Sequence, residues 1–198
     1  MLDVIKRCLR KFRVQKKQVS TPPTLICNNC VGGMVLHDFG IKFCTPTINL
    51  FIRPKDYILF LSDIHFYLTS EIKDKTGDSK YPVGELPNGI RIHFLHYKSF
   101  EEAMIAWYRR IERVDYNNVY VSFVAFNGTT IDDIVKFDSL PFSNKVVFVN
   151  HPMPEIKSSF YVKGFENDKG VERMTEFEGC WGKRYYDQFD WSEFLNLK

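Results

Sequence analysis

Residues 26–35 read Ile26-Cys27-Asn28-Asn29-Cys30-Val31-Gly32-Gly33-Met34-Val35, a short apolar run followed by a polar turn, two glycines and the start of a second apolar run. This order predicts a buried strand, a turn and then a helix. Backbone N–H groups at a helix start form an anion site, and glycines let a ligand approach the backbone closely. We therefore predict that Asn28, Asn29, Gly32 and Gly33 hold the phosphates of a ligand. In the alternative interpretation, the Asn side chains of the turn only cap the helix.

Strand-like and helix-like segments alternate outward from this stretch. Apolar runs of strand length cover residues 25–27, 47–52, 90–95, 118–126, 145–150 and 158–162. Helical patterns cover residues 33–39, 57–68, 99–114 and 130–137. Capping signals at Ser99 and Thr130 open the last two of these helices. A strand followed by a helix recurs along the chain, and short apolar strands suit burial on both sides. The predicted fold class is therefore α/β, a mainly parallel sheet with helices on both faces.

The length of 198 residues fits one α/β domain over residues 1–198, long enough to bury a sizeable core. A polar segment at residues 72–88, which contains Pro82 and Pro87, interrupts the alternation of strands and helices. If the chain divides into two α/β subdomains, this segment is the predicted boundary.

The composition excludes several classes of protein. Hydrophobic residues make up 44% of the chain and charged residues 26%, which is ordinary for a soluble globular protein. The net charge of +3 is too small for a dedicated nucleic-acid binder. Five cysteines at irregular spacing argue against a disulfide framework. The sequence shows no apolar run of roughly 18 residues and no secretory signal, so we expect a cytoplasmic protein.

Basic residues cluster near the N-terminus, at Lys6, Arg7, Arg10, Lys11, Arg13, Lys16 and Lys17. Apolar residues recur among them at spacings of three and four, which predicts a helix with one apolar face: Leu2, Ile5, Leu9 and Phe12. We expect this helix to dock on the core through that face and to leave its basic face in solvent. The alternative is peripheral membrane contact through residues 1–17, with the helix lying on an anionic membrane surface.

Polar residues follow several of the predicted strands, at the edge where open α/β sheets bind their ligands. Arg53 and Asn127 are predicted to bind a phosphate or hydroxyl groups there. His96 and His151 are candidate general bases, because imidazole titrates near neutral pH. His93 lies inside a predicted strand, and we expect it to be a hydrogen-bonded core residue.

The C-terminal segment Gly182-Lys183-Arg184-Tyr185-Tyr186 combines basic and aromatic residues. Its rings suit stacking on a sugar or a base, and Lys183 and Arg184 are predicted to bind phosphate. The alternative interpretation is a packed C-terminal segment with a charged surface.

Cys30 is a candidate nucleophile, since a thiol at a helix N-terminus can have a lowered pKa, with His96 or His151 as its base. Cys27 and Cys30 also have the C-x-x-C spacing of redox motifs, but no second pair completes a zinc site. The sequence contains neither an Asp-x-Asp triplet nor a G-x-S-x-G turn. We therefore predict no metal site, and the sequence identifies no cofactor.

Separate segments spread over nearly the full length match one family: Asn28-Asn29-Cys30 with Gly32-Gly33, Tyr81-Pro82-Val83-Gly84, His93-Phe94-Leu95-His96-Tyr97, Ser99-Phe100-Glu101-Glu102-Ala103 and Gly182-Lys183-Arg184-Tyr185-Tyr186-Asp187. Through them the chain resembles an uncharacterised bacterial family labelled exopolysaccharide biosynthesis protein, whose members occur among polysaccharide and capsule genes. The family commonly has Ser at position 27 and an acidic turn where this chain has Ala125-Phe126-Asn127-Gly128.

The residues and the resemblance together predict a transferase in exopolysaccharide or capsule assembly. It would move a sugar or acyl group from an activated donor, either nucleotide-linked or acyl-linked. The alternative is a non-catalytic accessory protein that binds a sugar nucleotide or a glycan intermediate. No nucleic acid is expected as a partner.

Overall fold

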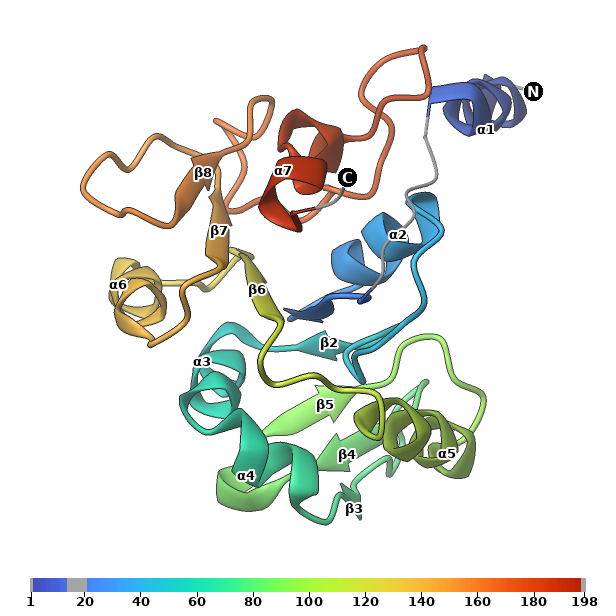
Figure 1. Ribbon diagram of the computed structural model, residues 1–198, viewed down its shortest axis with the longest axis vertical. Helices are drawn as coiled ribbons and strands as arrows, with labels where there is room; N and C mark the ends of the chain where they lie inside the picture. Colours follow the sequence, from blue (N-terminus) through green and yellow to red (C-terminus); the bar gives the residue numbers. More distant parts are fainter. Residues whose placement is uncertain (1, 14–20, 197–198) are drawn as a thin grey trace.

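Two four-stranded sheets meet in one hydrophobic core in the computed structural model, which describes residues 2–13 and 21–196 (Figure 1). The first sheet is parallel and has the strand order β1-β6-β7-β8. The second is antiparallel and has the order β2-β5-β4-β3. The strands are β1 (Thr24–Cys27), β2 (Phe51–Ile52), β3 (Lys73–Asp74), β4 (Val83–Glu85), β5 (Arg91–His93), β6 (Val119–Val124), β7 (Lys145–Val149) and β8 (Ser159–Tyr161).

The prediction of a mainly parallel sheet is correct for the first sheet and wrong for the second. β4 and β5 form a hairpin around the 3₁₀ turn Pro87–Gly89, where Asn88 and Gly89 have φ angles of 61° and 77°. Left-handed residues of this kind let the chain reverse tightly. The alternation of apolar and polar residues at 90–95 is typical of an antiparallel sheet with one covered face. Residues 72–88, the predicted boundary, contribute β3 and β4 to this second sheet.

The helices are α1 (Leu2–Arg13), α2 (Val31–Asp38), α3 (Pro54–Ser62), α4 (Ile64–Thr69), α5 (Phe100–Ile111), α6 (Ile131–Ser139) and α7 (Trp191–Phe194). The predicted capping signals are confirmed, since the side-chain oxygens of Ser99 and Thr130 accept hydrogen bonds from backbone N–H groups at the starts of α5 and α6. The helix predicted over residues 57–68 divides into α3 and α4. Asp63 separates them, because its carboxylate accepts the N–H of Phe66 and caps α4.

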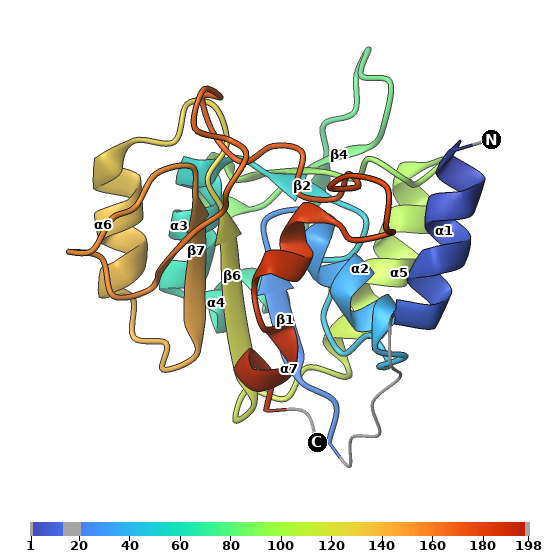
Figure 2. The same cartoon turned by 90° about the horizontal axis from the view of Figure 1, so that it is seen from above.

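Aromatic side chains pack the helices on the parallel sheet. The ring of Phe123, on β6, lies 5.8 Å from that of Tyr57 in α3 and 5.3 Å from that of Phe137 in α6. Phe148, on β7, instead lies 5.4 Å from Trp191 of α7. Figure 2 shows α3 and α6 on one side of β6 and β7, with α7 on the other.

Helix α1 is held on the core by the guanidinium of Arg10, whose side chain is 8% exposed. Its nitrogens donate to the carboxylates of Asp38 and Asp187, at 3.1 and 2.6 Å, and to the Tyr186 hydroxyl at 2.7 Å. Gly182, with a φ of 70°, packs directly on the helix, since a Cβ there would lie 2.7 Å from the Lys6 carbonyl oxygen. The helix is therefore docked on the rest of the protein.

The face by which α1 docks differs from the predicted one. Ile5, expected on the docked apolar face, is 51% exposed, whereas Arg10, expected on a solvated basic face, is buried. Two carboxylates compensate the buried guanidinium, and their hydrogen bonds outweigh the small apolar gain available to this short helix. Arg7 is exposed as expected, and Lys6 and Leu9 are partly buried. The side chains of the remaining residues in the prediction lie outside the described ones: Leu2, Lys11, Phe12, Arg13, Lys16 and Lys17.

Candidate functional site

A hollow of about 600 Å³ opens where β2 and β6 end, and we call it the Arg53 hollow. Three segments far apart in the sequence build it: the start of α3, the turn before β5 and the segment that follows β6. Its lining residues are Phe51, Arg53, Pro54, Lys55, Asp56, Gly89, Arg91, Phe126, Asn127 and Gly128. The hollow therefore joins the carboxyl edge of the parallel sheet to the antiparallel sheet.

The start of α3 faces this hollow without a side-chain cap. Arg53 is the N-cap residue, with extended backbone, and Pro54 occupies the first turn, where a missing N–H costs nothing. No side chain caps the helix through a hydrogen bond, so its first N–H groups stay available to a ligand in this part of the described structure. A helix start of this kind favours negative charge.

The charges that line the Arg53 hollow are mainly positive. Arg53, Lys55 and Arg91 contribute three cations, and Asp56 contributes one carboxylate. The Asp56 carboxylate accepts the backbone N–H of Arg91 at 3.2 Å, which joins the start of α3 to β5. Guanidinium groups bind phosphate and carboxylate through paired hydrogen bonds, so this arrangement suits an anionic ligand.

Two aromatic rings provide an apolar wall for the same hollow. Phe51 and Phe126 meet edge to face, with their ring centroids 5.1 Å apart. Phe51 also covers His93, whose ring lies 5.9 Å away. Rings at such a position can contact the flat face of a base or the apolar face of a sugar.

His93 differs from the expected hydrogen-bonded core histidine. Both ring nitrogens are buried and have no hydrogen-bond partner within the described part of the chain. Burial lowers the pKa of His93, and the nearby Arg53 guanidinium lowers it further, so the neutral imidazole is favoured. The ring therefore packs between Phe51 and Tyr81 as an uncharged aromatic group.

The loop at residues 168–171 explains why the Arg53 hollow opens beside β2 and not farther along the parallel sheet. The N–H of Val171 donates to the carbonyl of Ala125 at 2.8 Å, and the Asn150 side chain donates to the carbonyl of Asp168 at 2.7 Å. Gly170 makes this approach possible, since a Cβ there would lie 2.6 Å from the Ala125 oxygen. The loop thereby covers the carboxyl end of β7 and packs on the segment that follows β6.

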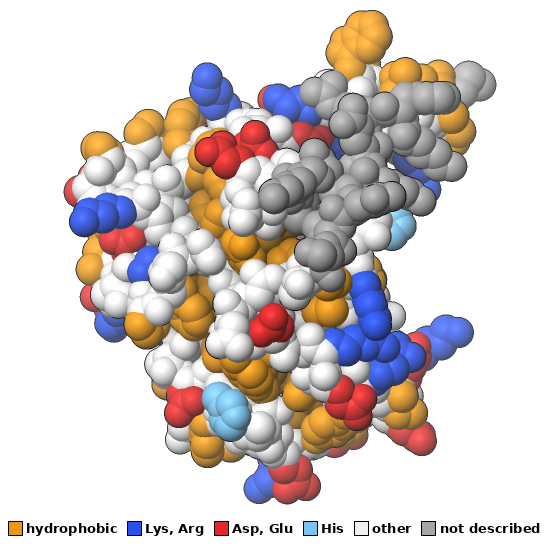
Figure 3. Space-filling view, viewed as in Figure 1, with side chains coloured by type: hydrophobic (Ala, Val, Ile, Leu, Met, Phe, Trp, Pro, Cys, Tyr) orange, Lys and Arg blue, Asp and Glu red, His pale blue; other side chains and the backbone are white. Residues whose placement is uncertain are grey.

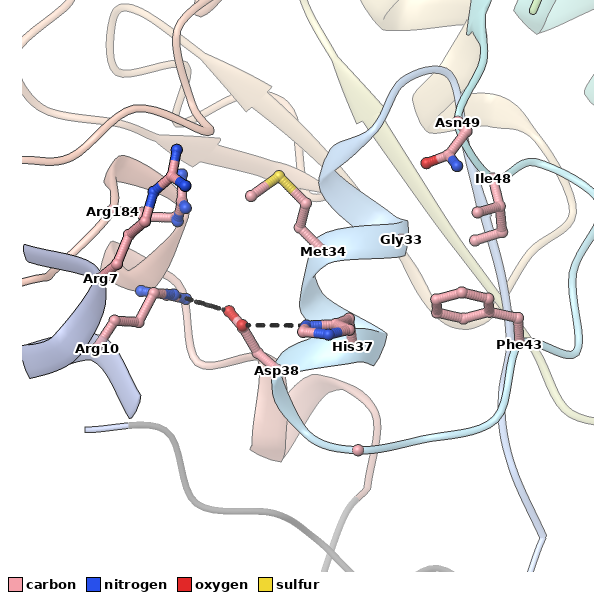
Figure 4. Close-up of a pocket in the computed structure, with 11 residues that line it drawn as sticks. Arg7, Arg10, Gly33, Met34, His37, Asp38, Phe43, Ile48, Asn49 and Arg184 are labelled. Carbon is pink, nitrogen blue, oxygen red and sulfur yellow. Dashed lines mark hydrogen bonds and ion pairs between the residues drawn. The ribbon is translucent and has the colours of Figure 1, made fainter. Parts of the chain in front are cut away.

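A second, larger hollow of about 1060 Å³ follows the outer side of α2, and we call it the α2 hollow (Figure 4). Arg7 and Arg184 lie on one side of the helix, and Phe43, Ile48 and Asn49 lie on the other. The complete lining is Arg7, Arg10, Gly33, Met34, His37, Asp38, Gly40, Phe43, Ile48, Asn49 and Arg184. The two hollows share no lining residue.

The polar turn at residues 28–29 is used inside the protein. Asn28 is fully buried, and its amide makes two hydrogen bonds with the backbone of Val124, at 3.0 and 2.9 Å. It thus continues the pairing of β1 with β6 beyond the end of the strand. The side-chain oxygen of Asn29 accepts the N–H of Val31 at 3.0 Å, at the start of α2. A ligand would have to displace these bonds to reach either side chain.

Gly32 and Gly33 have different surroundings. A Cβ on Gly32 would lie 2.1 Å from the Cys27 sulfur, so the missing side chain lets α2 pack directly on β1. Gly33 lines the α2 hollow, where a Cβ would lie 3.3 Å from Ile48. Burial raises the pKa of the Cys27 thiol to about 12, and its sulfur lies 2.8 Å from the Ser122 hydroxyl.

The lowered pKa expected for Cys30 is not found. Burial raises the pKa of this half-buried thiol above its ordinary value, even though Cys30 is the N-cap residue of α2. Desolvation disfavours the thiolate, the form that a helix start would favour. The raised pKa does not support a nucleophilic Cys30, and that role stays a prediction.

The remaining predicted residues lie apart from one another. His96 and His151 are exposed and line neither hollow. Lys183 pairs with Glu178 at 3.1 Å, whereas the Arg184 guanidinium donates to the carbonyl of Thr175 and lines the α2 hollow. The structure thus brings together Arg53 with Asn127 in one hollow and Gly33 with Arg184 in the other.

Several residues of the Arg53 hollow were not predicted. Lys55 and Asp56 follow Arg53-Pro54 at the helix start, and that position was a usable signal. Arg91 and Phe51 reach the hollow through the pairing of β5 with β2, and the sequence carries no local sign of that pairing. Phe126 was expected inside a strand.

The fold and the hollows define a mixed α/β protein with a cationic, aromatic-walled cavity at the edge of its parallel sheet. None of the described helices is long and apolar enough to cross a membrane. Within the described residues, His, Cys, Asp and Glu side chains form no group of three or more that could hold a metal ion.

The chain belongs to the family described as "Domain of unknown function (DUF1919)", whose family model matches residues 1–196. It is also similar to a Haemophilus influenzae protein described as "Uncharacterized protein", with 41% identity over 183 residues. The match covers 92% of this chain and 88% of that protein. Membership of an uncharacterised family is thereby confirmed.

Proposed function

We propose that this protein is a transferase of exopolysaccharide or capsule assembly that binds an activated donor in the Arg53 hollow. The observation that carries the proposal is the meeting of Arg53, Lys55 and Arg91 with the uncapped start of α3. A nucleotide-linked or acyl-linked donor carries phosphate, and this is the charge that such a site attracts.

The rest of the hollow suits the uncharged parts of such a donor. Its volume of about 600 Å³ lies in the range of small-molecule sites. Phe51 and Phe126 provide a surface for a base or a sugar ring, and the Asn127 side chain is exposed for hydrogen bonds to hydroxyl groups. Asp56 supplies a carboxylate that would act as the general base on an incoming acceptor.

Donor binding is the first test. UDP-, GDP- and CMP-linked sugars and acyl-coenzyme A are titrated, and we expect one class to bind. Arg53→Ala and Arg91→Ala should each weaken that binding by roughly 10- to 100-fold, since each removes charge-assisted hydrogen bonds to phosphate. Both side chains are exposed, so the variants should fold. Arg109→Ala, on the exposed side of α5, is the matched control and should bind normally. Binding that is equal in all three variants would contradict the site.

Turnover separates the transferase from its alternative. Asp56→Asn keeps the size of the side chain and removes the base, so it should bind donor while transfer or donor hydrolysis falls. A wild-type protein that binds the donor without turnover would instead be the accessory protein, one that holds a sugar nucleotide or a glycan intermediate. His96 and His151 remain predicted bases, and His96→Ala and His151→Ala belong in the same assay.

A cytoplasmic location with peripheral membrane contact through α1 is a further part of this proposal. Val4 is 69% exposed and Trp181, beside the Gly182 that packs on α1, is 78% exposed. Hydrophobic side chains gather over α1 at the upper right of Figure 3. Tryptophan and aliphatic side chains beside basic residues such as Arg7 are typical of proteins that lie on an anionic bilayer.

Vesicle sedimentation tests this contact. Ile5→Asp places a charge on the outward side of α1 and should reduce sedimentation with phosphatidylserine vesicles several-fold, since it removes an aliphatic anchor. Ile105→Asp is the matched control, because Ile105 is 62% exposed on α5, away from this surface. Equal sedimentation of wild type, both variants and a protein that lacks residues 1–17 would rule out the contact.

A further inference from the structure

We propose that the α2 hollow binds an amphipathic anion, an alkyl chain that carries a phosphate group. Nothing in the Arg53 site accounts for this second hollow, which is the larger of the two and shares no lining residue with it. The further step, that this ligand is the acceptor of the transfer reaction, rests on the proposed function. The binding of the ligand does not depend on that function.

The apolar wall of the α2 hollow is fixed in place. Ile48 is buried, and its carbonyl accepts the Tyr97 hydroxyl at 3.2 Å. The guanidinium of Arg110 lies over the ring of Phe43, 5.8 Å from the centroid of that ring. Met34, from α2, adds apolar surface on the side of the helix that faces Arg7 and Arg184, and its flexible side chain suits an irregular partner (Figure 4). A linear hydrocarbon chain fits such a wall.

The opposite wall carries positive charge that the protein does not neutralise. Arg10 is engaged by Asp38 and Asp187, so its charge is already compensated. Arg7 is exposed and makes no ion pair with any described residue. The Arg184 guanidinium is held over the Phe177 ring at 4.3 Å, with its Nε lacking a hydrogen-bond partner in the described structure. Two cations thus face the hollow from the side opposite its apolar wall (Figure 4).

The distribution of these groups decides the class of ligand. A free phosphate would use the cations and leave the apolar wall in water. A neutral hydrocarbon would cover the wall and leave the cations unused. A phosphate that bears an alkyl chain meets both walls at once, with the phosphate at Arg7 and Arg184 and the chain over α2 toward Ile48 and Phe43.

Calorimetric titration with octyl phosphate, octyl glucoside and inorganic phosphate tests this class, with the two octyl compounds kept below their micelle concentrations. Octyl phosphate should bind at least tenfold more tightly than either of the others. Equal binding of inorganic phosphate would reduce the site to a simple anion site, and equal binding of octyl glucoside would reduce it to an apolar groove. Either result overturns the proposal, as does the absence of octyl phosphate binding.

Variants then locate the bound molecule. Met34→Glu puts a carboxylate on the arginine side of α2, where it repels the phosphate, and Arg7→Gln removes a cation, so each should weaken octyl phosphate binding about tenfold. Met34→Leu keeps the apolar surface and should bind normally, which separates a lost site from a misfolded protein. Arg53→Ala should leave octyl phosphate binding unchanged while it weakens donor binding, and this difference keeps the two sites distinguishable. Unchanged binding in both Met34→Glu and Arg7→Gln would place the ligand elsewhere and refute the assignment.

Discussion

Replacing Arg10 with alanine should lower the free energy of unfolding by about 3–5 kcal/mol, the range found when one partner of a buried ion pair is removed. The substitution leaves the carboxylates of Asp38 and Asp187 without their shared cation. The Tyr186 hydroxyl, which donates to Asp38 at 2.6 Å, also loses its contact with the guanidinium. Chemical denaturation of the full chain measures the loss.

The charge state of Arg10 supports an effect of this size. Burial by itself would lower the pKa of the guanidinium, but the hydrogen bonds to Asp187 and Asp38 outweigh burial and raise it. The buried Arg10 guanidinium therefore keeps its charge near neutral pH, and the network does not relax by the loss of its proton. The pair is also long-range, since Asp187 is 177 positions away in the sequence.

Two further variants show what Arg10 contributes. Arg10→Lys keeps the charge but loses the planar fork that reaches two carboxylates, so we expect an intermediate loss of stability. Arg7→Ala lies on the exposed side of the same helix and should change the unfolding free energy by less than about 0.5 kcal/mol. Should Arg10→Ala unfold at the wild-type denaturant concentration, the network would be shown to contribute nothing to stability.

The strength of local signals explains which parts of the fold were predictable. The caps at Ser99 and Thr130 depend on residues three positions apart, and the strands around 118–126 and 145–150 are long apolar runs. The antiparallel sheet depends instead on the pairing of β2, only two residues long, with β5 about forty positions away. No periodicity in a two-residue strand can reveal its partner.

The candidate site was likewise predictable where local signals mark it and not where it depends on contacts between distant residues. Arg53 and Asn127 were predicted because both follow apolar runs at the ends of strands, and the structure brings them to one hollow. Gly32 was assigned to a ligand because a glycine at a helix start permits close approach. The sequence could not show that the approaching group is the Cys27 sulfur. The sequence also could not predict the orientation of α1, because the carboxylates that set it, Asp38 and Asp187, lie far from Arg10 in the sequence.

Replacing Asn28 with alanine should have the second large effect, a loss of about 2–5 kcal/mol of unfolding free energy, because it leaves two buried backbone groups without partners. The Asn28 amide donates to the Val124 carbonyl and accepts the Val124 N–H, at 3.0 and 2.9 Å, in a fully buried position. The Asn28 carbonyl also accepts the N–H of Ile52 at 2.9 Å. The residue therefore joins β1 to β6 at the point where the second sheet begins.

The neighbouring residue offers a matched control and makes the prediction decisive. Asn29→Ala removes one local hydrogen bond from Val31 and should cost about 1 kcal/mol or less, the value for a single hydrogen bond. Hydrogen exchange of the Val124 amide should accelerate in Asn28→Ala and stay slow in Asn29→Ala. If Asn28 instead serves the donor phosphates, as its place in the sequence suggested, Asn28→Ala would keep wild-type stability and Val124 protection while donor binding fell. A structural Asn28 predicts a loss of stability, whereas a ligand-binding Asn28 predicts a loss of donor binding at wild-type stability. The pair of variants therefore distinguishes an asparagine that holds two strands together from one that holds a ligand.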